Sequence, residues 1–140
     1  MNIFPTLRYD DAPAALAFLR DTFGFEIVAD YRAADDPQRV DHAELRWPEG
    51  GGVMLGSAQR AESSIKALPA GVGSVYVVTT RPDELYARAT AAGAAITHEL
   101  QDEHYGSRGF TCRDAEGVHW SFGTYAGEAA QRAQLNVSSA

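Results

Sequence analysis

The chain has 140 residues, a mass of 15.1 kDa and a formal net charge of −7, and its 45% hydrophobic and 22% charged residues are ordinary for a soluble globular protein. This length fits one compact domain with a core of its own. The acidic balance argues against a nucleic-acid partner, which requires a basic surface, and no apolar run approaches the ~20 residues of a membrane helix, so we expect no nucleic acid, no membrane and a cytoplasmic protein.

The first half of the sequence predicts the order βαβββ. We expect strands at 2–9, 25–31, 40–47 and 52–57, and a helix that begins after Asp10 or Asp11 and ends at Gly24. An aspartate at a helix start accepts hydrogen bonds from the first turn, proline at position 13 is tolerated there, and glycine takes the left-handed conformation at a helix end. Pro5 cannot donate to a sheet and indicates an edge strand or one that leaves its own module.

Residues 58–72 are small or polar and are interpreted as a linker, after which the same order returns. We expect strands at 73–79 and 94–100, a helix capped by Thr80 that ends at Gly93, and a closing hairpin within 105–125. The chain thus predicts a single domain at 1–125, with modules at about 2–57 and 73–125. Residues 126–140 form a tail with at most a short helix between Gly127 and Leu135.

The two halves share landmarks at nearly constant spacing. Pro13 and Pro82 are 69 residues apart, as are Gly24 and Gly93, whereas the glycines that end the two hairpin turns, Gly51 and Gly117, are 66 apart. Repetition of a supersecondary unit predicts two modules that pair, because each has a sheet face that it cannot bury alone.

Characteristic stretches of the two modules lie at 7–13, Phe18, 23–25, 42–45, 86–89, 93–94 and 105–125. With these stretches, the paired βαβββ modules resemble the glyoxalase/bleomycin-resistance/dioxygenase superfamily, also called the vicinal oxygen chelate superfamily. The resemblance implies an α+β fold in which two βαβββ modules form a cup-shaped mixed sheet with helices on the convex face. It also implies homodimers with ligand cavities at the subunit interface. The stretch 105–125 is most similar to the bleomycin-resistance-like and thiocoraline-type antibiotic-binding branch.

Enzymes of this superfamily hold a divalent metal at one position on the first and last strands of each module. Those positions fall here at Phe4, Leu55, Ser74 and Ser121, and none is a histidine or carboxylate, so we expect no metal and no cofactor. An alternative metal or acid/base site would use His42, Glu44 and His119.

Strand alternation predicts which side chains line the cup. Trp120 is assigned to the core, Cys112 is expected to be a buried hydrophobic residue, and His98 and His104 are expected to be solvated. Arg108 either anchors a turn through Asp114 or touches the ligand. The predicted ligand-binding residues are Phe4, His42, Glu44, Trp47, Leu55, Ser57, Ser74, Tyr76, Tyr105, Arg108, His119 and Ser121.

These observations predict a metal-independent small-molecule-binding homodimer that sequesters a flat aromatic or cationic antibiotic in a cavity at the dimer interface. One alternative is a lyase, isomerase or dioxygenase of the same superfamily with a non-standard metal or acid/base site. A third interpretation is a structural or protein-interaction role with an empty cup.

Overall fold

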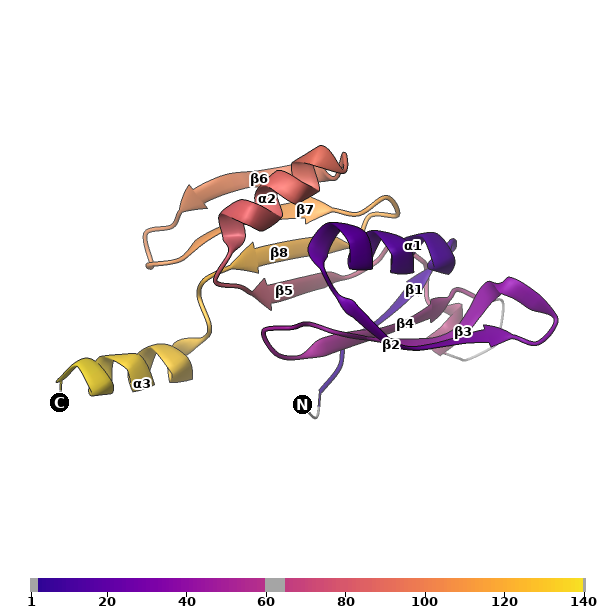
Figure 1. Cartoon of the computed structure of the whole chain (residues 1–140), viewed down its shortest axis with the longest axis horizontal. Coiled ribbons are helices and arrows are strands. Elements are labelled where there is room, and N and C mark those ends of the chain that lie inside the picture. Colours follow the sequence, from indigo (N-terminus) through magenta and orange to yellow (C-terminus); the bar gives the residue numbers. More distant parts are fainter. Residues whose placement is uncertain (1–2, 60–64, 140) are drawn as a thin grey trace.

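The computed structural model of the chain describes residues 3–59 and 65–139. It has the expected α+β architecture of two βαβββ modules, each with a four-stranded mixed sheet (Figure 1). In the first module the strand order is β1-β4-β3-β2, with β1 parallel to β4 and the other neighbours antiparallel. Its elements are β1 (Thr6–Tyr9), α1 (Ala12–Phe18), the π-helical η1 (Leu19–Phe23), β2 (Glu26–Ala33), β3 (Asp36–Arg46) and β4 (Gly52–Ser57).

The second module repeats this arrangement with the order β5-β8-β7-β6, again with one parallel pair, β5 and β8. A short 3₁₀ helix, η2 (Ile65–Ala67), precedes it. Its elements are β5 (Ser74–Val78), α2 (Pro82–Ala91), β6 (Ala95–Asp102), β7 (Arg108–Arg113) and β8 (His119–Gly123), and α3 (Glu128–Ser139) follows.

The helix ends follow the predicted signals with one exception. The Asp11 carboxylate accepts a hydrogen bond from the Ala14 N–H, and Gly24 and Gly93 have positive φ at the two helix ends. Thr80 is not the cap of α2, because the helix begins one residue later, after Arg81. Counted from the first helical residue to the glycine, α1 together with η1 is one residue longer than the corresponding stretch from Pro82 to Gly93. The π-helical turn of η1 accommodates the extra residue.

The two hairpin turns fix the register of the repeat. The Gly50 N–H donates to the Trp47 carbonyl, just as the Gly117 N–H donates to the Asp114 carbonyl. Gly50, and not the expected Gly51, is thus the equivalent of Gly117, and the spacing of the two hairpins is 67 residues. Because side chains alternate along a strand, this shift of one residue exchanges the two faces of β4.

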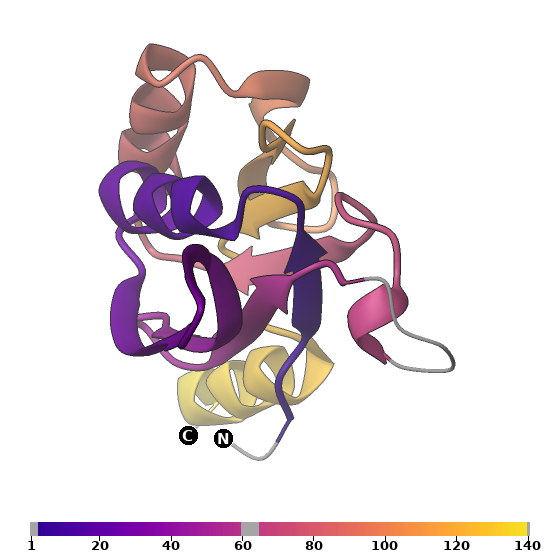
Figure 2. The ribbon, with the colours of Figure 1, turned by 90° about the vertical axis from the view of Figure 1, so that its right-hand side faces the viewer.

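Both modules contribute to one hydrophobic core beneath the helices. Phe23 and Phe25 pack against Trp120 of β8, and Trp47 packs against Phe25 and Phe122 with ring centroids 4.9 and 6.0 Å apart. Trp120 is fully buried, as predicted, and so is Cys112. The two helical segments lie next to each other (Figure 2), and the guanidinium of Arg88 on α2 donates to the Asp21 carbonyl of η1.

Two glutamates join the modules reciprocally. Glu116, in the β7–β8 turn, accepts hydrogen bonds from the Asp10 and Asp11 N–H groups before α1. Its counterpart Glu49, in the β3–β4 turn, accepts from the Thr80 N–H and from both threonine hydroxyls, of Thr79 and Thr80, before α2. Each hairpin turn therefore holds the strand-to-helix junction of the other module, which explains why the modules dock in pairs.

Glu49→Gln is expected to lower the free energy of unfolding at pH 7 by about 1 kcal/mol, because it removes the charged acceptor of three hydrogen bonds. The loss is modest because these bonds are partly exposed to solvent. Burial raises the pKa of Glu49, but the hydrogen bonds from Thr80 and Thr79 outweigh it, so the net pKa is lowered. A lowered folded-state pKa stabilises the fold above the ordinary carboxyl pKa of about 4.3, and this contribution is lost as the pH falls through the folded-state value.

Urea unfolding at pH 7 and pH 3 tests this, with Glu99→Gln, an exposed glutamate on β6, as the control for net charge. The difference in the free energy of unfolding between wild type and Glu49→Gln should disappear at pH 3. An unchanged difference at the two pH values would assign the effect to packing rather than to the carboxylate.

The C-terminal helix α3 projects from the body of the domain in Figure 1 and extends beyond the short segment expected at Gly127–Leu135. Its side chains from Glu128 to Leu135 are all exposed. None of the helices in the described part of the chain has the length and apolar content needed to cross a membrane.

Candidate functional site

The helix-free face of the second sheet carries an open hollow of about 480 Å³. Aromatic rings, small hydroxyls, an imidazole and a carboxylate surround it, which is the mixed lining typical of a site for an organic ligand. The residues that line it are Tyr76, His98, Glu103, Tyr105, Ser107, Gly109, Phe110, Thr111, Ser121, Phe122 and Gly123.

Tyr76 and Tyr105 supply the aromatic surface of the hollow, and they are 48% and 51% exposed. The Tyr76 hydroxyl donates to the Tyr125 carbonyl at 2.7 Å, and burial raises the pKa of this phenol, so it remains a neutral donor. A Cβ atom on Gly123 would lie 2.6 Å from that hydroxyl, so the glycine makes room for the phenol. The Tyr105 ring packs edge-on against Tyr125, with centroids 5.8 Å apart.

The floor of the hollow holds a pair of hydroxyl groups. Thr111 and Ser121 are direct neighbours on β7 and β8, and their oxygen atoms are 2.8 Å apart. Ser121 therefore lies where strand alternation predicted it. His119 and Ser74 are exposed and paired in register at the end of the same sheet, outside the residues that line the hollow.

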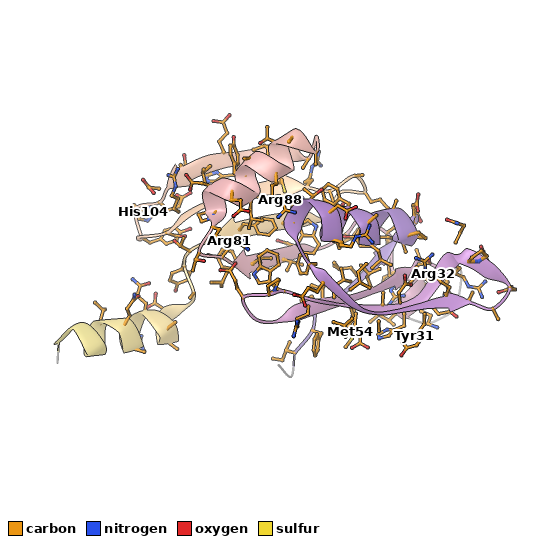
Figure 3. The ribbon with its side chains drawn as sticks, viewed as in Figure 1. Tyr31, Arg32, Met54, Arg81, Arg88 and His104 are labelled. Carbon is orange, nitrogen blue, oxygen red and sulfur yellow. The ribbon has the colours of Figure 1, made fainter. Side chains whose placement is uncertain are left out.

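The helix-free face of the first sheet carries a second group of predicted site residues. His42 Nε2 lies 3.2 Å from Glu44 Oε2, and the ring of Tyr31 stacks on the imidazole at a centroid distance of 6.4 Å. Met54 and Tyr31 lie on the side of the sheet opposite α1 (Figure 3). Phe4 borders a smaller hollow of about 260 Å³ here, with Glu44 among the other lining residues.

Three residues predicted to line the cup belong to the core instead. Leu55 is fully buried in the hydrophobic cluster, and Ser57 is buried with its hydroxyl accepting from the Val40 N–H. Both errors follow from the register of the hairpin turn, which places Met54 on the open face. Trp47, the third of them, is 3% exposed, and its indole N–H donates to the Val78 carbonyl.

Arg108 neither anchors a turn through Asp114 nor lines the hollow. Its guanidinium makes two hydrogen bonds to Asp83 on α2, at 2.8 and 3.2 Å, and one to Asp102 on β6. The hydrogen bonds from Arg108 to Asp83 and Asp102 raise the pKa of the guanidinium. Arg108 thus links α2 to the β6–β7 hairpin and has a structural role.

The residues at the superfamily's metal positions do not fit a divalent ion. With the register corrected, these positions are Phe4, Met54, Ser74 and Ser121, a set without imidazole or carboxylate. The alternative set is not assembled either: His42 and Glu44 lie on the first sheet and His119 on the second. Among residues 3–59 and 65–139 no three His, Cys, Asp or Glu side chains are grouped to hold a metal.

Several residues of the hollow were missed by the sequence analysis. Thr111 could have been predicted, because it is the direct partner of Ser121 on the neighbouring strand and its side chain therefore lies on the same face. His98 was expected to be solvated, and it is exposed, but it also lines the hollow and contacts Glu103. Register shifts in β6 on either side of His98 break the alternation of its side chains, so no simple pattern identifies this pair.

The fold and the hollow together define an α+β protein of paired βαβββ modules with an open, ligand-accessible sheet face. A family model described as the Glyoxalase/Bleomycin resistance protein/Dioxygenase superfamily matches residues 4–122, and the chain belongs to this superfamily. Uncharacterized proteins of Mycobacterium bovis and Mycobacterium tuberculosis are 30% identical over 127 residues, covering 85% of this chain and 80% and 71% of theirs.

The chain is also similar to solved structures. TioX from Micromonospora sp. ML1 is 32% identical with a TM-score of 0.73, and the match covers 88% of this chain and 97% of that one. A glyoxalase/bleomycin resistance protein from Streptomyces sp. CB03234 shares the fold at 19% identity with a TM-score of 0.64, over 87% of this chain and 98% of that one.

Proposed function

We propose that this chain is a metal-independent binding protein for flat aromatic small molecules. The observation that carries the proposal is the hollow on β5–β8. The half-exposed rings of Tyr76 and Tyr105 line it together with the paired hydroxyl groups of Thr111 and Ser121. Rigid aromatic side chains bury a planar ligand with little entropy loss, and hydroxyls orient it. Binding of this kind needs no catalytic group.

The description of the superfamily includes bleomycin resistance proteins, and this supports an antibiotic as the ligand and sequestration as the proposed role. The proposal extends to a homodimer in which a second copy covers the open hollow. Exposed apolar side chains support it: Leu135 on the projecting α3 is 61% exposed, and Val28 and Tyr31 on the helix-free face of the first sheet are 65% and 62% exposed. An isolated helix of this length is marginal in water, so contact with a partner would stabilise it.

Tyr105→Ala is expected to weaken binding of a flat aromatic antibiotic by about tenfold. The substitution removes the apolar area of the ring and also its stacking interaction, which contributes on the order of 1 kcal/mol beyond the free energy of burial. Isothermal titration calorimetry with bleomycin and thiocoraline measures this. Tryptophan quenching is unsuitable, since Trp47 and Trp120 are 3% and 0% exposed and neither lines the hollow.

Leu68→Ala is the control, since Leu68 is a similarly exposed apolar side chain, at 52%, in the segment between the modules. It should leave the affinity unchanged. If no planar aromatic compound binds, or if both variants lose affinity equally, the proposed ligand site on β5–β8 is wrong.

A further inference from the structure

The turn between β6 and β7 brings a carboxylate to the rim of the hollow. Glu103 Oε1 lies 2.7 Å from His98 Nε2 and 3.1 Å from Gln101 Nε2. The glutamate side chain is only 21% exposed, although it is at the end of a strand. His98 and Gln101, both on the preceding strand β6, therefore hold this carboxylate at the rim of the hollow.

The backbone of the turn holds Glu103 in this place. Its N–H donates to the Ser107 carbonyl at 2.7 Å, and its own carbonyl accepts from the Gly106 N–H at 3.0 Å. Both side-chain contacts of Glu103 are made by Oε1. Among the described residues, no side chain or backbone group is hydrogen-bonded to Oε2. One oxygen atom therefore orients the carboxylate and the other is available to a ligand.

Among the described residues that line the hollow, Glu103 is the only acidic one, and none of them is an arginine or a lysine. The nearest arginine of β7, Arg108, is bound to Asp83 and Asp102 instead. Hydrogen bonds from His98 and then Gln101 lower the pKa of Glu103, so the carboxylate stays ionised at neutral and mildly acidic pH. The hollow thus combines one negative charge with two exposed phenol rings.

We propose that Glu103 recognises a positively charged nitrogen of the ligand, whose aromatic ring system lies against Tyr76 and Tyr105. A carboxylate pairs with a cation more strongly than with a neutral group, and the faces of aromatic rings attract cations. The ligand class is therefore a flat aromatic compound that carries a fixed or protonated cationic nitrogen. This inference rests on the proposed function, because it names the charge of the ligand of the same hollow.

The test compares two fluorescent probes of nearly equal shape, the cation 10-methylacridinium and the neutral 10-methylacridone, by equilibrium dialysis at pH 7.5. Wild-type protein should bind the cation about tenfold more tightly than the neutral probe. Glu103→Gln should remove most of this preference for the cation, because the amide keeps the shape of the side chain and loses its charge.

Asp102→Asn is the matched control. It removes the same charge one residue away, but the Asp102 side chain is 80% exposed, is paired with Arg108 and does not line the hollow. This variant should keep the preference for the cation. Equal losses in the two variants would assign the preference to the protein's net charge and overturn the inference, as would equal weakening of both probes by Glu103→Gln.

The results also separate this inference from the proposed function. Equal affinity of wild-type protein for both probes would overturn the role of Glu103 and keep the aromatic site. Failure of both probes to bind would reject the aromatic site and the cation site together.

Discussion

Asp114→Ala is expected to lower the free energy of unfolding by about 3–5 kcal/mol, on the order of 10 °C in melting temperature. Asp114 is 9% exposed, and its carboxylate accepts five hydrogen bonds. Oδ2 accepts from the Tyr9 hydroxyl at 2.6 Å and from the Trp120 indole at 3.0 Å, and both donors are fully buried. Oδ1 accepts from three successive backbone N–H groups of the β7–β8 turn, at residues 116–118.

Removal of this carboxylate leaves two buried side-chain donors and the N–H groups of Glu116 and Val118 without their partner, whereas the Gly117 N–H keeps the Asp114 carbonyl. Such unpaired groups cost more than the bonds themselves contribute. Tyr9→Phe removes one of the five and should cost about 1–2 kcal/mol. Urea unfolding of both single variants and the double variant measures the coupling between the two side chains. A loss below 1 kcal/mol for Asp114→Ala would show that water or side-chain rearrangement replaces the network.

This network also shows where sequence reasoning reaches its limit. The acidic glycine turn at Asp114 was recognised as a hairpin, but its partner Tyr9 lies 105 residues away in the other module. The order βαβββ and the burial of Trp120 and Cys112 could be predicted, because turn residues and strand alternation are local signals. Contacts between modules depend on how the two halves dock, which no local pattern encodes.

The candidate site depended on register, and register is sensitive to a single residue. Two adjacent glycines, Gly50 and Gly51, both suit the end of the β3–β4 turn. The predicted alignment of Gly51 with Gly117 places Leu55 in the cup. The hydrogen bonds of the turns align Gly50 with Gly117 instead, and this register places Met54 on the open face. In the second module the expected faces of β5 and β8 match the structure, and so Tyr76 and Ser121 were found.

Gly109 and Gly123, which are direct partners on β7 and β8, should respond to alanine in opposite ways. A Cβ atom on Gly109 would lie 2.3 Å from the Phe122 carbonyl oxygen, a backbone atom that cannot move without disturbing the sheet. Gly109→Ala should therefore cost about 2–4 kcal/mol of folding free energy. The nearest atoms to a Cβ on Gly123 are instead the hydroxyls of Tyr76 and Ser107, and the end of the tyrosine side chain can swing away.

Gly123→Ala should thus keep the folding free energy within about 1 kcal/mol of wild type and displace the Tyr76 ring, which loses its hydrogen bond to the Tyr125 carbonyl. Because that ring is one wall of the hollow, the affinity for a planar aromatic ligand should fall at least tenfold. Thermal unfolding and calorimetric titration of both variants separate the two effects. Loss of affinity without loss of stability in Gly123→Ala would locate the ligand against Tyr76, whereas unchanged affinity would mean that the ligand contacts another face of the domain.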